Sequence, residues 1–533
     1  MSTTPAATYR RYRAPEADGA TLVDPPADDL LGLLEANRME RAATDLAIDG
    51  TPLQEFAAAA RQELLRRAYQ FTRSWCDVDE PADDAASQPL VASGHQPELF
   101  HPGVWYKNFA LDQLAQSAGG TGVHLLIDSD LCRDVSIRTP TGSIDKPRVE
   151  SAPYDQPNGD LPFEERVIKE HSLLESFGER VTQTLGGLVE EPLAQSITAD
   201  LVEAARATGN LGLTLSHARR RVEGRWGGQS LELPLSQVCD TPAFCRFTSH
   251  LLGDLSQLHA AYNEALGDYR QAHRLRTPAQ PLPDLAVEDN WHETPLWAWT
   301  EENRTRQPLF ARWRENTCEL TNRAGDTWQL GEQSNLADSL ADLRKQGVKI
   351  RSRALITTLY SRLVLADLFL HGIGGAKYDE VTDNFAHRLL GHTPPPHATL
   401  TATLRLPIDY PAVDPAEGAH LRHKLRELEY HPELFVDRGL PGVSNLVVAK
   451  RIAIAEPERD DSNRYRHERI ERANAALHPY VEDERDAVLA RLDQLATEQQ
   501  ADAILGSREY SFCLFPEAYL REQMQTLTAP IAS

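Results

Sequence analysis

The chain of 533 residues is poor in cysteine and has no long apolar run. Its six cysteines, Cys76, Cys132, Cys239, Cys245, Cys318 and Cys513, are scattered and form neither a CxxC pair nor a zinc-ribbon spacing. No stretch reaches the roughly 18 uninterrupted apolar residues that indicate a membrane span, and the N-terminus lacks the apolar core of a signal peptide. These absences predict a cytoplasmic protein with reduced thiols and without a membrane partner.

Positive charge is also in short supply. The sequence has 55 Lys and Arg against 79 Asp and Glu, which gives a formal net charge of -24. A general nucleic-acid surface needs clustered cations, so the composition argues against nucleic acid as a partner. A local basic pocket for a small anion remains compatible with this composition.

Changes of pattern along the chain predict a mixed α/β protein. At about 150 residues per domain, this length gives three or four folding units. We expect, in chain order, an N-terminal helical segment at 1–84, the first half of a parallel-sheet core at 85–165, a helical insertion at 166–284, a small β region with the second half of the core at 285–397, and a C-terminal helical region at 398–533.

Three of these segments carry more specific predictions. Phe247–Arg276 has the pattern of one long helix, and Trp297–Gly331 alternates like a β-meander. In the last segment, Val481, Val488 and Leu492 have partial heptad spacing. That spacing is compatible with a coiled coil that pairs two copies into a homodimer, and equally with an ordinary solvated helix.

The most informative stretch is Leu90–Ala115, which has the pattern of a short strand, a polar turn and a helix. Leu90–Ala92 suits a buried strand that ends at Gly94, and the polar residues that follow are His95, Gln96, His101 and Lys107. In open α/β sheets, ligands bind where strands end and helices begin, because free backbone N–H groups converge there. The alternative is a turn whose histidines only satisfy local backbone groups.

Two later segments have the same character. An apolar strand from Val123 ends in Asp128, Ser129 and Asp130, and the apolar run Leu365–Leu370 leads directly into His371 and a glycine-rich turn. Glycines alone are a weak signal, but Lys377, Asp379 and the nearby Arg353 and Arg362 accompany them. We predict that the three polar segments converge on one crevice at the carboxyl ends of parallel strands.

These segments resemble a known family, the bacillithiol-biosynthesis cysteine-adding enzymes. GHQPELFHPGVWYKNFALDQLA is similar to the family's glycine-glutamine turn and first core helix, with Gly94, Gln96, Leu99 and Phe100 matching and His95 in place of a glutamine. LLIDSDLCRD resembles the family's acidic strand end at Ser129 and Asp130. LFLHGIGGAKYDE is similar to its Gly-Gly-Pro-Gly-Glu loop, with Gly374 and Gly375 kept and the Pro-Gly pair absent.

The resemblance implies a Rossmann-like core akin to that of HIGH-motif nucleotidyltransferases. It also implies a ligase that joins a cysteine-like amino acid to a small amine-bearing acceptor in low-molecular-weight thiol biosynthesis, with ATP or ADP as the candidate cofactor. We expect catalytic roles for His95, His101 and Asp130, with Asp130 as the base toward the amine. The expected substrate-binding residues are Gly94, Gln96, Lys107, Asp128, Ser129, Arg353, His371, Gly374, Gly375, Lys377 and Asp379, and no residue is assigned to a metal.

Two other functions fit the same residues. A nucleotidyltransferase would need a divalent metal, for which Asp128 and Asp130 offer oxygen ligands. A non-catalytic protein would use the crevice only to bind a small anion or nucleotide. In each case we expect the crevice to take an anionic group, because Lys107 lies near a helix N-terminus that already favours negative charge.

Overall fold

In the computed structural model the chain folds into two units, and residues 12–277, 280–411, 413–455 and 463–532 are described. The larger unit comprises Met1–Thr139, Glu150–Leu406 and Arg508–Ser533, and the smaller comprises Pro140–Val149 and Pro407–Ser507. Across the described ranges, no helix has both the length and the hydropathy of a membrane span.

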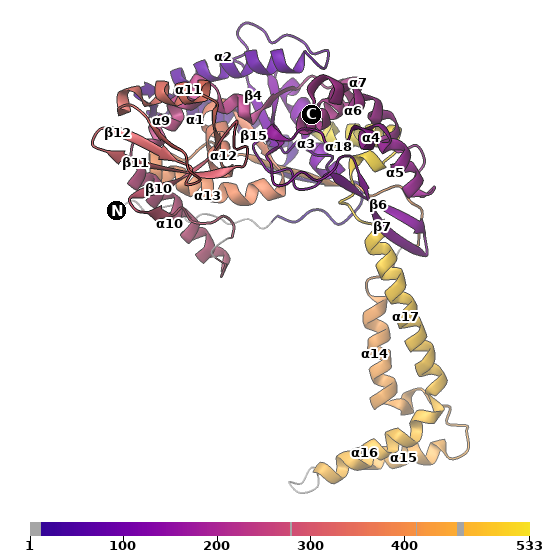
Figure 1. Ribbon diagram of the computed structural model, residues 1–533. Helices are drawn as coiled ribbons and strands as arrows, with labels where there is room; N and C mark the ends of the chain where they lie inside the picture. Colours follow the sequence, from indigo (N-terminus) through magenta and orange to yellow (C-terminus); the bar gives the residue numbers. More distant parts are fainter. Residues whose placement is uncertain (1–11, 278–279, 412, 456–462, 533) are drawn as a thin grey trace. The chain divides into compact units, whose positions relative to one another are not determined.

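A six-stranded sheet organises the larger unit (Figure 1). Its strands, in spatial order, are β1 (Ala20–Asp24), β16 (Ala398–Thr403), β15 (Leu368–His371), β4 (Leu90–His95), β5 (Thr121–Leu126) and β8 (Leu231–Pro234). The strands from β16 to β8 are parallel, and β1 joins β16 antiparallel. The expected mixed α/β architecture with a parallel sheet is therefore present.

The strand order reverses at the middle of this sheet. From β4 the chain moves outward to β5 and β8, and it later returns to β15 on the other side of β4. The neighbouring strands are in close register, with Leu370 beside Ser93 and Leu125 beside Gly94. The polar segments after β4, β5 and β15 thus leave the sheet at the same edge, where open parallel sheets bind ligands.

Helix α3 (Pro102–Ser117) packs on β4, β5 and β16. His101 caps it by accepting a hydrogen bond from the Gly103 backbone N–H at 3.1 Å, and Pro102 occupies the first turn. A Cβ atom on Gly103 would lie 2.2 Å from the carbonyl oxygen of Ala402. Only glycine therefore lets α3 approach β16 this closely.

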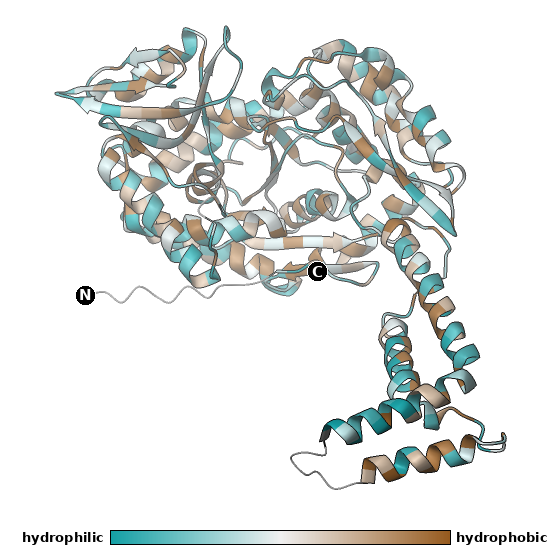
Figure 2. Ribbon diagram, turned by 60° about the horizontal axis from the view of Figure 1, so that its bottom comes forward, coloured by the Kyte–Doolittle hydropathy of each residue, from teal (hydrophilic) through white to brown (hydrophobic). Residues whose placement is uncertain are grey.

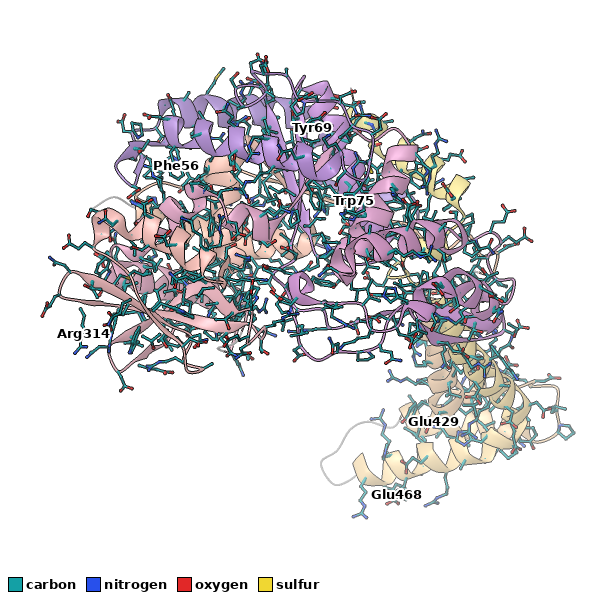
Figure 3. The ribbon with its side chains drawn as sticks, turned by 45° about the horizontal axis from the view of Figure 1, so that its top comes forward. Phe56, Tyr69, Trp75, Arg314, Glu429 and Glu468 are labelled. Carbon is teal, nitrogen blue, oxygen red and sulfur yellow. The ribbon has the colours of Figure 1, made fainter. Side chains whose placement is uncertain are left out.

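Further helices surround the sheet of the larger unit. They are α1 (Leu30–Ala43), α2 (Leu53–Thr72), α12 (Ala354–Tyr360), α13 (Ile373–Leu390) and α18 (Glu517–Thr528), and a π-helix covers Ser361–Leu365. Phe56 and Tyr69 lie along α2, and Trp75 lies just beyond its end (Figure 3). The Trp75 ring stacks on His217 at a centroid distance of 3.6 Å, which ties the end of α2 to a helix of the next segment.

The expected insertion at 166–284 is helical but contains a strand of the core. Its helices are α4 (His171–Glu175), α5 (Phe177–Leu185), α6 (Ala194–Thr208), α7 (Leu211–Arg225), α8 (Leu235–Cys239), α9 (Pro242–Leu252) and α10 (Leu255–His273). Strand β8 lies between α7 and α8 and pairs with β5. The segment is thus part of the core, and not only an insertion into it.

Phe247–Arg276 is two helices instead of the one expected. Helix α9 ends at Leu252, and α10 begins at Leu255 after Gly253 and Asp254. The Asp254 side chain accepts a hydrogen bond from the Gln257 backbone N–H at 2.9 Å, which makes it an N-cap. A glycine followed by a capping aspartate stops the helical pattern even though the apolar spacing continues.

The predicted meander is confirmed as a second, antiparallel sheet. It is formed by β13 (Thr327–Gln329), β12 (Thr317–Thr321), β11 (Gln307–Arg314), β10 (Trp291–Thr300) and β14 (Val348–Ser352), with β9 (Val287–Glu288) beside β10. Helix α11 (Leu336–Lys345) precedes β14 and contacts it. Two short pairs complete the strands: β2 (Ala47–Ile48) with β3 (Thr51–Pro52), and β6 (Ser136–Ser143) with β7 (Lys146–Pro153).

The smaller unit is helical, with α14 (Glu417–Tyr430), α15 (Val443–Ala455), α16 (Asn463–Leu477) and α17 (Glu482–Leu505). Leu428, Val443, Leu477 and Val488 belong to its own hydrophobic core. Helix α15 is largely hydrophobic and α16 largely hydrophilic (Figure 2). Only the middle part of the expected helical region at 398–533 therefore belongs to the smaller unit.

At either end of that region the chain belongs to the larger unit. Strand β16 opens it, and α18 closes it by packing on α3. The sequence of β16, ATLTAT, has only one large apolar side chain, so it lacks the pattern of a buried strand although all six residues are buried.

Candidate functional site

A cavity of about 170 Å³ lies at the carboxyl ends of β5 and β8, and we call it the strand-end cavity. Its apolar wall includes Leu126 and Pro234, the last residues of the two strands. Its polar lining consists of Asp128, Glu164, Asn210, Ser216, Ser236 and Gln237. Among the described residues, no lysine, arginine or histidine lines this cavity.

The first turns of α7 form one side of the cavity. The Asn210 side chain caps this helix by accepting a hydrogen bond from the Leu213 backbone N–H at 2.9 Å. A Cβ on Gly212 would stand 3.0 Å from Phe163 Cβ and 3.1 Å from Pro97 Cγ, so a larger residue would push these neighbours back by a few tenths of an ångström. The cavity is therefore shaped by an ordered helix terminus.

Asp128 is a buried carboxylate in the lining of the strand-end cavity, and its hydrogen-bond donors are neutral. It accepts hydrogen bonds from the Ser236 backbone N–H at 2.9 Å and from Ser236 Oγ at 2.5 Å. No ion pair joins it to a cation among the described residues. Burial raises the pKa of Asp128 to about 7 and the charge of Glu164 adds to this rise, while the bonds from Ser236 oppose it.

Glu164, the other carboxylate of the cavity, is neutralised by a cation. Arg351 donates to both of its oxygens, from Nε at 2.8 Å and from Nη2 at 2.7 Å. Burial alone would raise the pKa of Glu164, but the charge and hydrogen bonds of Arg351 outweigh burial and lower it. The cavity thus holds one paired and one unpaired carboxyl group.

Asp130, two residues beyond Asp128, is held by charged and polar donors. Gln96 Nε2 donates to it at 2.9 Å and Arg306 Nη1 at 3.0 Å. Burial raises the pKa of Asp130, but the bond from Gln96 and the charge of Arg306 outweigh this effect and lower the pKa. Arg306 also donates to the Ser129 carbonyl at 3.0 Å, so Gln96, Ser129 and Asp130 form one group outside the cavity lining.

Arg353, expected to bind substrate, lies close to this group, because Arg353 and Arg306 both pack against the Trp297 ring. The Arg306 guanidinium is 4.3 Å and that of Arg353 is 4.0 Å from the Trp297 ring centroid. Arg353 Nη2 donates to Glu293 at 2.7 Å. Its charge is therefore already paired.

The half-buried Gly94 and His95 end β4, and the buried Lys107 of α3 lies beside them. Lys107 Nζ donates to the Gly94 carbonyl at 2.7 Å, and burial together with the charge of Arg219 lowers the pKa of Lys107 to about 8. Burial also lowers the pKa of His95 to about 3, with the charge of Lys107 adding to the effect. The anion site expected at Lys107 is thus distinct from the strand-end cavity.

His101, the remaining histidine of this segment, is occupied by its role as the cap of α3. Its Nε2 lies 3.6 Å from Glu509 Oε2, and burial lowers its pKa to about 4. The alternative interpretation, in which a histidine of this turn satisfies a local backbone group, explains its bond with the Gly103 N–H.

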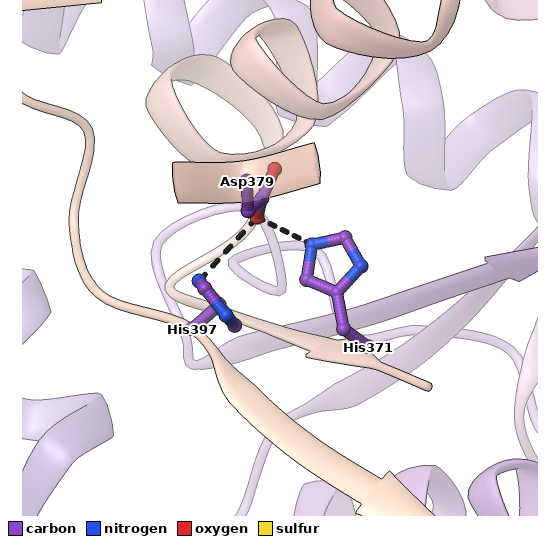
Figure 4. A group of neighbouring side chains, drawn as sticks. All are labelled: His371, Asp379 and His397. Carbon is purple, nitrogen blue, oxygen red and sulfur yellow. Dashed lines mark ion pairs between the residues drawn. The ribbon is translucent and has the colours of Figure 1, made fainter. Parts of the chain in front are cut away.

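Five of the expected binding residues lie at the end of β15 and in α13, namely His371, Gly374, Gly375, Lys377 and Asp379. His371 Nε2 is 2.5 Å from Asp379 Oδ2, and His397 Nδ1 is 3.4 Å from the same oxygen (Figure 4). We call His371, Asp379 and His397 the His371 cluster. A Cβ on Gly375 would lie 2.5 Å from His371 Nδ1, whereas Gly374 faces open space.

The structure therefore distributes the predicted residues over separate groups at one sheet edge. Asp128 lines the strand-end cavity, and neither the His371 cluster nor the exposed Lys377 does. Sequence reasoning missed the partners that define these groups, namely Glu164, Ser236, Arg306, Arg351 and His397. Of these, Ser236 had a detectable signal, because it directly follows β8 as a polar residue at a strand end.

Neither the models of known protein families nor the curated proteins include a match to this chain.

Proposed function

We propose that the protein is an enzyme that acts on a small amine-bearing substrate at the strand-end cavity of a Rossmann-like sheet. Numbered in chain order, the parallel strands β8, β5, β4, β15 and β16 stand as 3-2-1-4-5 across the sheet. This order is typical of Rossmann-like folds. It supports the fold that the resemblance to the cysteine-adding enzymes implies.

The observation that carries the proposal is the opposite behaviour of two carboxyl groups on one turn. Asp128 has a pKa raised to about 7, whereas the pKa of Asp130 is lowered. Environments that separate two neighbouring pKa values in this way are typical of acid–base chemistry. A base with a pKa near neutrality combines sufficient ionisation with sufficient basicity.

These pKa values favour Asp128 over Asp130 as the catalytic base. Gln96 and Arg306 donate to the Asp130 carboxylate and stabilise its negative charge, so we assign Asp130 the role of positioning the turn. In the proposed reaction the amine nitrogen attacks the acyl carbon of an activated, cysteine-like amino acid. A C–N bond forms, the activating group leaves with its electron pair, and Asp128 accepts the proton of the amine.

The charge of the strand-end cavity matches an amine better than a phosphate. Its lining has two carboxylates and no cation among the described residues. A volume of about 170 Å³ is also below the roughly 300–1,000 Å³ of pockets that enclose whole ligands. ATP and ADP, the candidate cofactors, do not fit this cavity, and we assign no step to them.

The nucleotidyltransferase alternative has less support. It would need Asp128 and Asp130 on one metal ion, but their carboxylates are bonded to different partners, Ser236 on one side and Gln96 and Arg306 on the other.

We also propose that the protein acts in the cytoplasm as a homodimer through its smaller unit. The exposed Val448 and Ile452 on α15 support such a contact.

An amide-forming assay tests the proposed function. A preformed activated cysteine, such as its adenylate, and a panel of amino sugars are supplied to the purified protein, with N-acetylated sugars and protein-free mixtures as negative controls, and amide product is followed by mass spectrometry. Asp128→Asn should lower kcat/KM by about 10²–10⁴-fold, and the exposed Asp145→Asn should leave it unchanged. If the wild type neither forms product nor binds any primary amine in calorimetry, the proposal is wrong.

A further inference from the structure

We propose that His371, Asp379 and His397 form a binding site for a divalent transition-metal ion, with zinc as the best match. Each residue offers one ligand atom, and the three atoms lie within 4.8 Å of one another. Two imidazoles and one carboxylate form a donor set that suits zinc and neighbouring metals, and three protein ligands leave a coordination position open. This site is separate from the strand-end cavity and does not depend on the proposed function.

The spacing of the donors is close to that of a tetrahedral site. Metal–ligand bonds of 2.0–2.1 Å place neighbouring ligand atoms about 3.3 Å apart. His397 Nδ1 already lies 3.4 Å from Asp379 Oδ2. His371 Nε2 lies at 2.5 Å, so its ring must withdraw by roughly 0.8 Å to admit the ion.

Unused bonding capacity in the cluster points to a ligand. Asp379 is fully buried, and its Oδ1 has no hydrogen-bond partner among the described residues. His371 Nε2 is also buried and lacks a partner with hydrogen-bond geometry, despite its short contact with Asp379. Buried polar atoms without partners are costly, and a metal ion bound to His371 Nε2 would offset that cost at the imidazole.

The charges around the cluster permit a cation. Arg362 Nη1 lies 3.0 Å from Asp379 Oδ2 and 2.8 Å from Asp383 Oδ1. With neutral imidazoles, one guanidinium and two carboxylates leave one net negative charge, which outweighs the opposing N-terminus of α13. The Pro395 carbonyl accepts from Arg362 Nε at 3.0 Å and so anchors the guanidinium, which thereby orients Asp379.

Metal titration of the purified full-length protein tests this site. After dialysis against a chelator, Zn²⁺ and Co²⁺ are added separately, with binding followed by calorimetry and by the Co²⁺ absorption spectrum. We expect one equivalent of each ion to bind and a Co²⁺ spectrum without sulfur charge-transfer bands. A spectrum with such bands would place the ion on a cysteine and overturn the proposal.

Substitutions then assign the ligands. His397→Gln and His371→Gln should each weaken Zn²⁺ binding by about 100-fold or more, since even changes in residues that only orient a ligand cost 10–100-fold. His273→Gln is the matched control, because His273 pairs with Glu380 of α13 outside the cluster, and it should bind Zn²⁺ as the wild type does. Circular dichroism confirms that each variant is folded. Absence of Zn²⁺ binding by the wild type, or unchanged affinity in folded His371 and His397 variants, contradicts the site.

Discussion

The two ends of the parallel strands bury carboxylates in opposite ways. At the amino end, Asp367 precedes β15 and both of its oxygens accept hydrogen bonds from cations: Arg41 at 2.9 Å, and Arg61 at 3.0 and 2.9 Å. The Leu90 backbone N–H at the start of β4 adds a bond at 2.8 Å. These contacts join α1, α2 and the two central strands into one network.

At the carboxyl end the buried carboxylates are less completely compensated. Asp128 has neutral donors only, and Asp379 keeps one oxygen without a hydrogen bond among the described residues. Burial is similar at both ends, so the partners decide the outcome. Full pairing stabilises the sheet, whereas incomplete pairing leaves groups that can exchange a proton or take a ligand.

The largest expected effect comes from breaking the amino end. Asp367→Ala leaves the buried Arg41 and Arg61 without their counter-charge, and removal of one partner from a buried ion pair costs about 3–5 kcal/mol. Urea unfolding should show a loss of that size in the free energy of unfolding. The exposed Asp145→Ala should stay within about 0.5 kcal/mol of the wild type. A loss below about 1 kcal/mol for Asp367→Ala would remove the contrast between the two ends.

At the carboxyl end, Asp128→Asn should instead stabilise the protein at alkaline pH. The folded pKa of Asp128 is raised to about 7 from 3.8, so the wild type loses stability as the pH rises from about 4 to about 7. The amide avoids this loss, because its oxygen accepts from the Ser236 backbone N–H and its NH2 group donates to Ser236 Oγ in place of the bond that Asp128 accepts. We expect a gain on the order of 2 kcal/mol at pH 8 that shrinks as the pH falls toward 4. Thermal unfolding across this range measures it, and a gain independent of pH contradicts the assigned pKa.

Part of this contrast was predictable from sequence, since local signals specify the strands and their ends. The apolar residues of β4 and the proline that opens α3 indicated the central strand–turn–helix, and alternation indicated the second sheet. Strand β8 was missed because Glu232, a charged residue, is buried in it. That burial depends on a bond from Arg219 of α7, a partner that no local pattern announces.

The roles of the site residues were less predictable for the same reason. The sequence placed the base at Asp130, whereas Ser236 and Arg306 differentiate Asp128 from Asp130 and come from remote segments. His397 directly precedes β16, beyond the end of α13, and lies beside the same Asp379 oxygen as His371. The spacing of residues along the chain predicts neither this cluster nor the partners of Asp128 and Asp130, because the order of the strands brings them together.

A smaller effect should separate two adjacent glycines beside the His371 cluster. In Gly375→Ala the added Cβ would stand 2.5 Å from His371 Nδ1, so the ring must shift, at a cost of about 1–2 kcal/mol. Gly374→Ala meets nothing within 4 Å and should be neutral or stabilising by up to about 1 kcal/mol. Denaturant unfolding of both variants measures the difference. Equal stabilities would mean that His371 is not confined by Gly375.

The smallest expected effect tests whether the carboxyl end selects an amine or an anion. Lys107 donates to the Gly94 carbonyl and does not line the strand-end cavity, so Lys107→Met should change amine affinity by less than about twofold in the folded variant. Calorimetry with an amino sugar, and separately with citrate and ATP, compares the variant with the wild type. A tenfold loss of citrate or ATP binding would instead show that Lys107 holds an anion, as the sequence alone suggests. That result would mean that this edge of the sheet binds an anion through Lys107 at the end of β4, and not an amine through the carboxylates that follow β5.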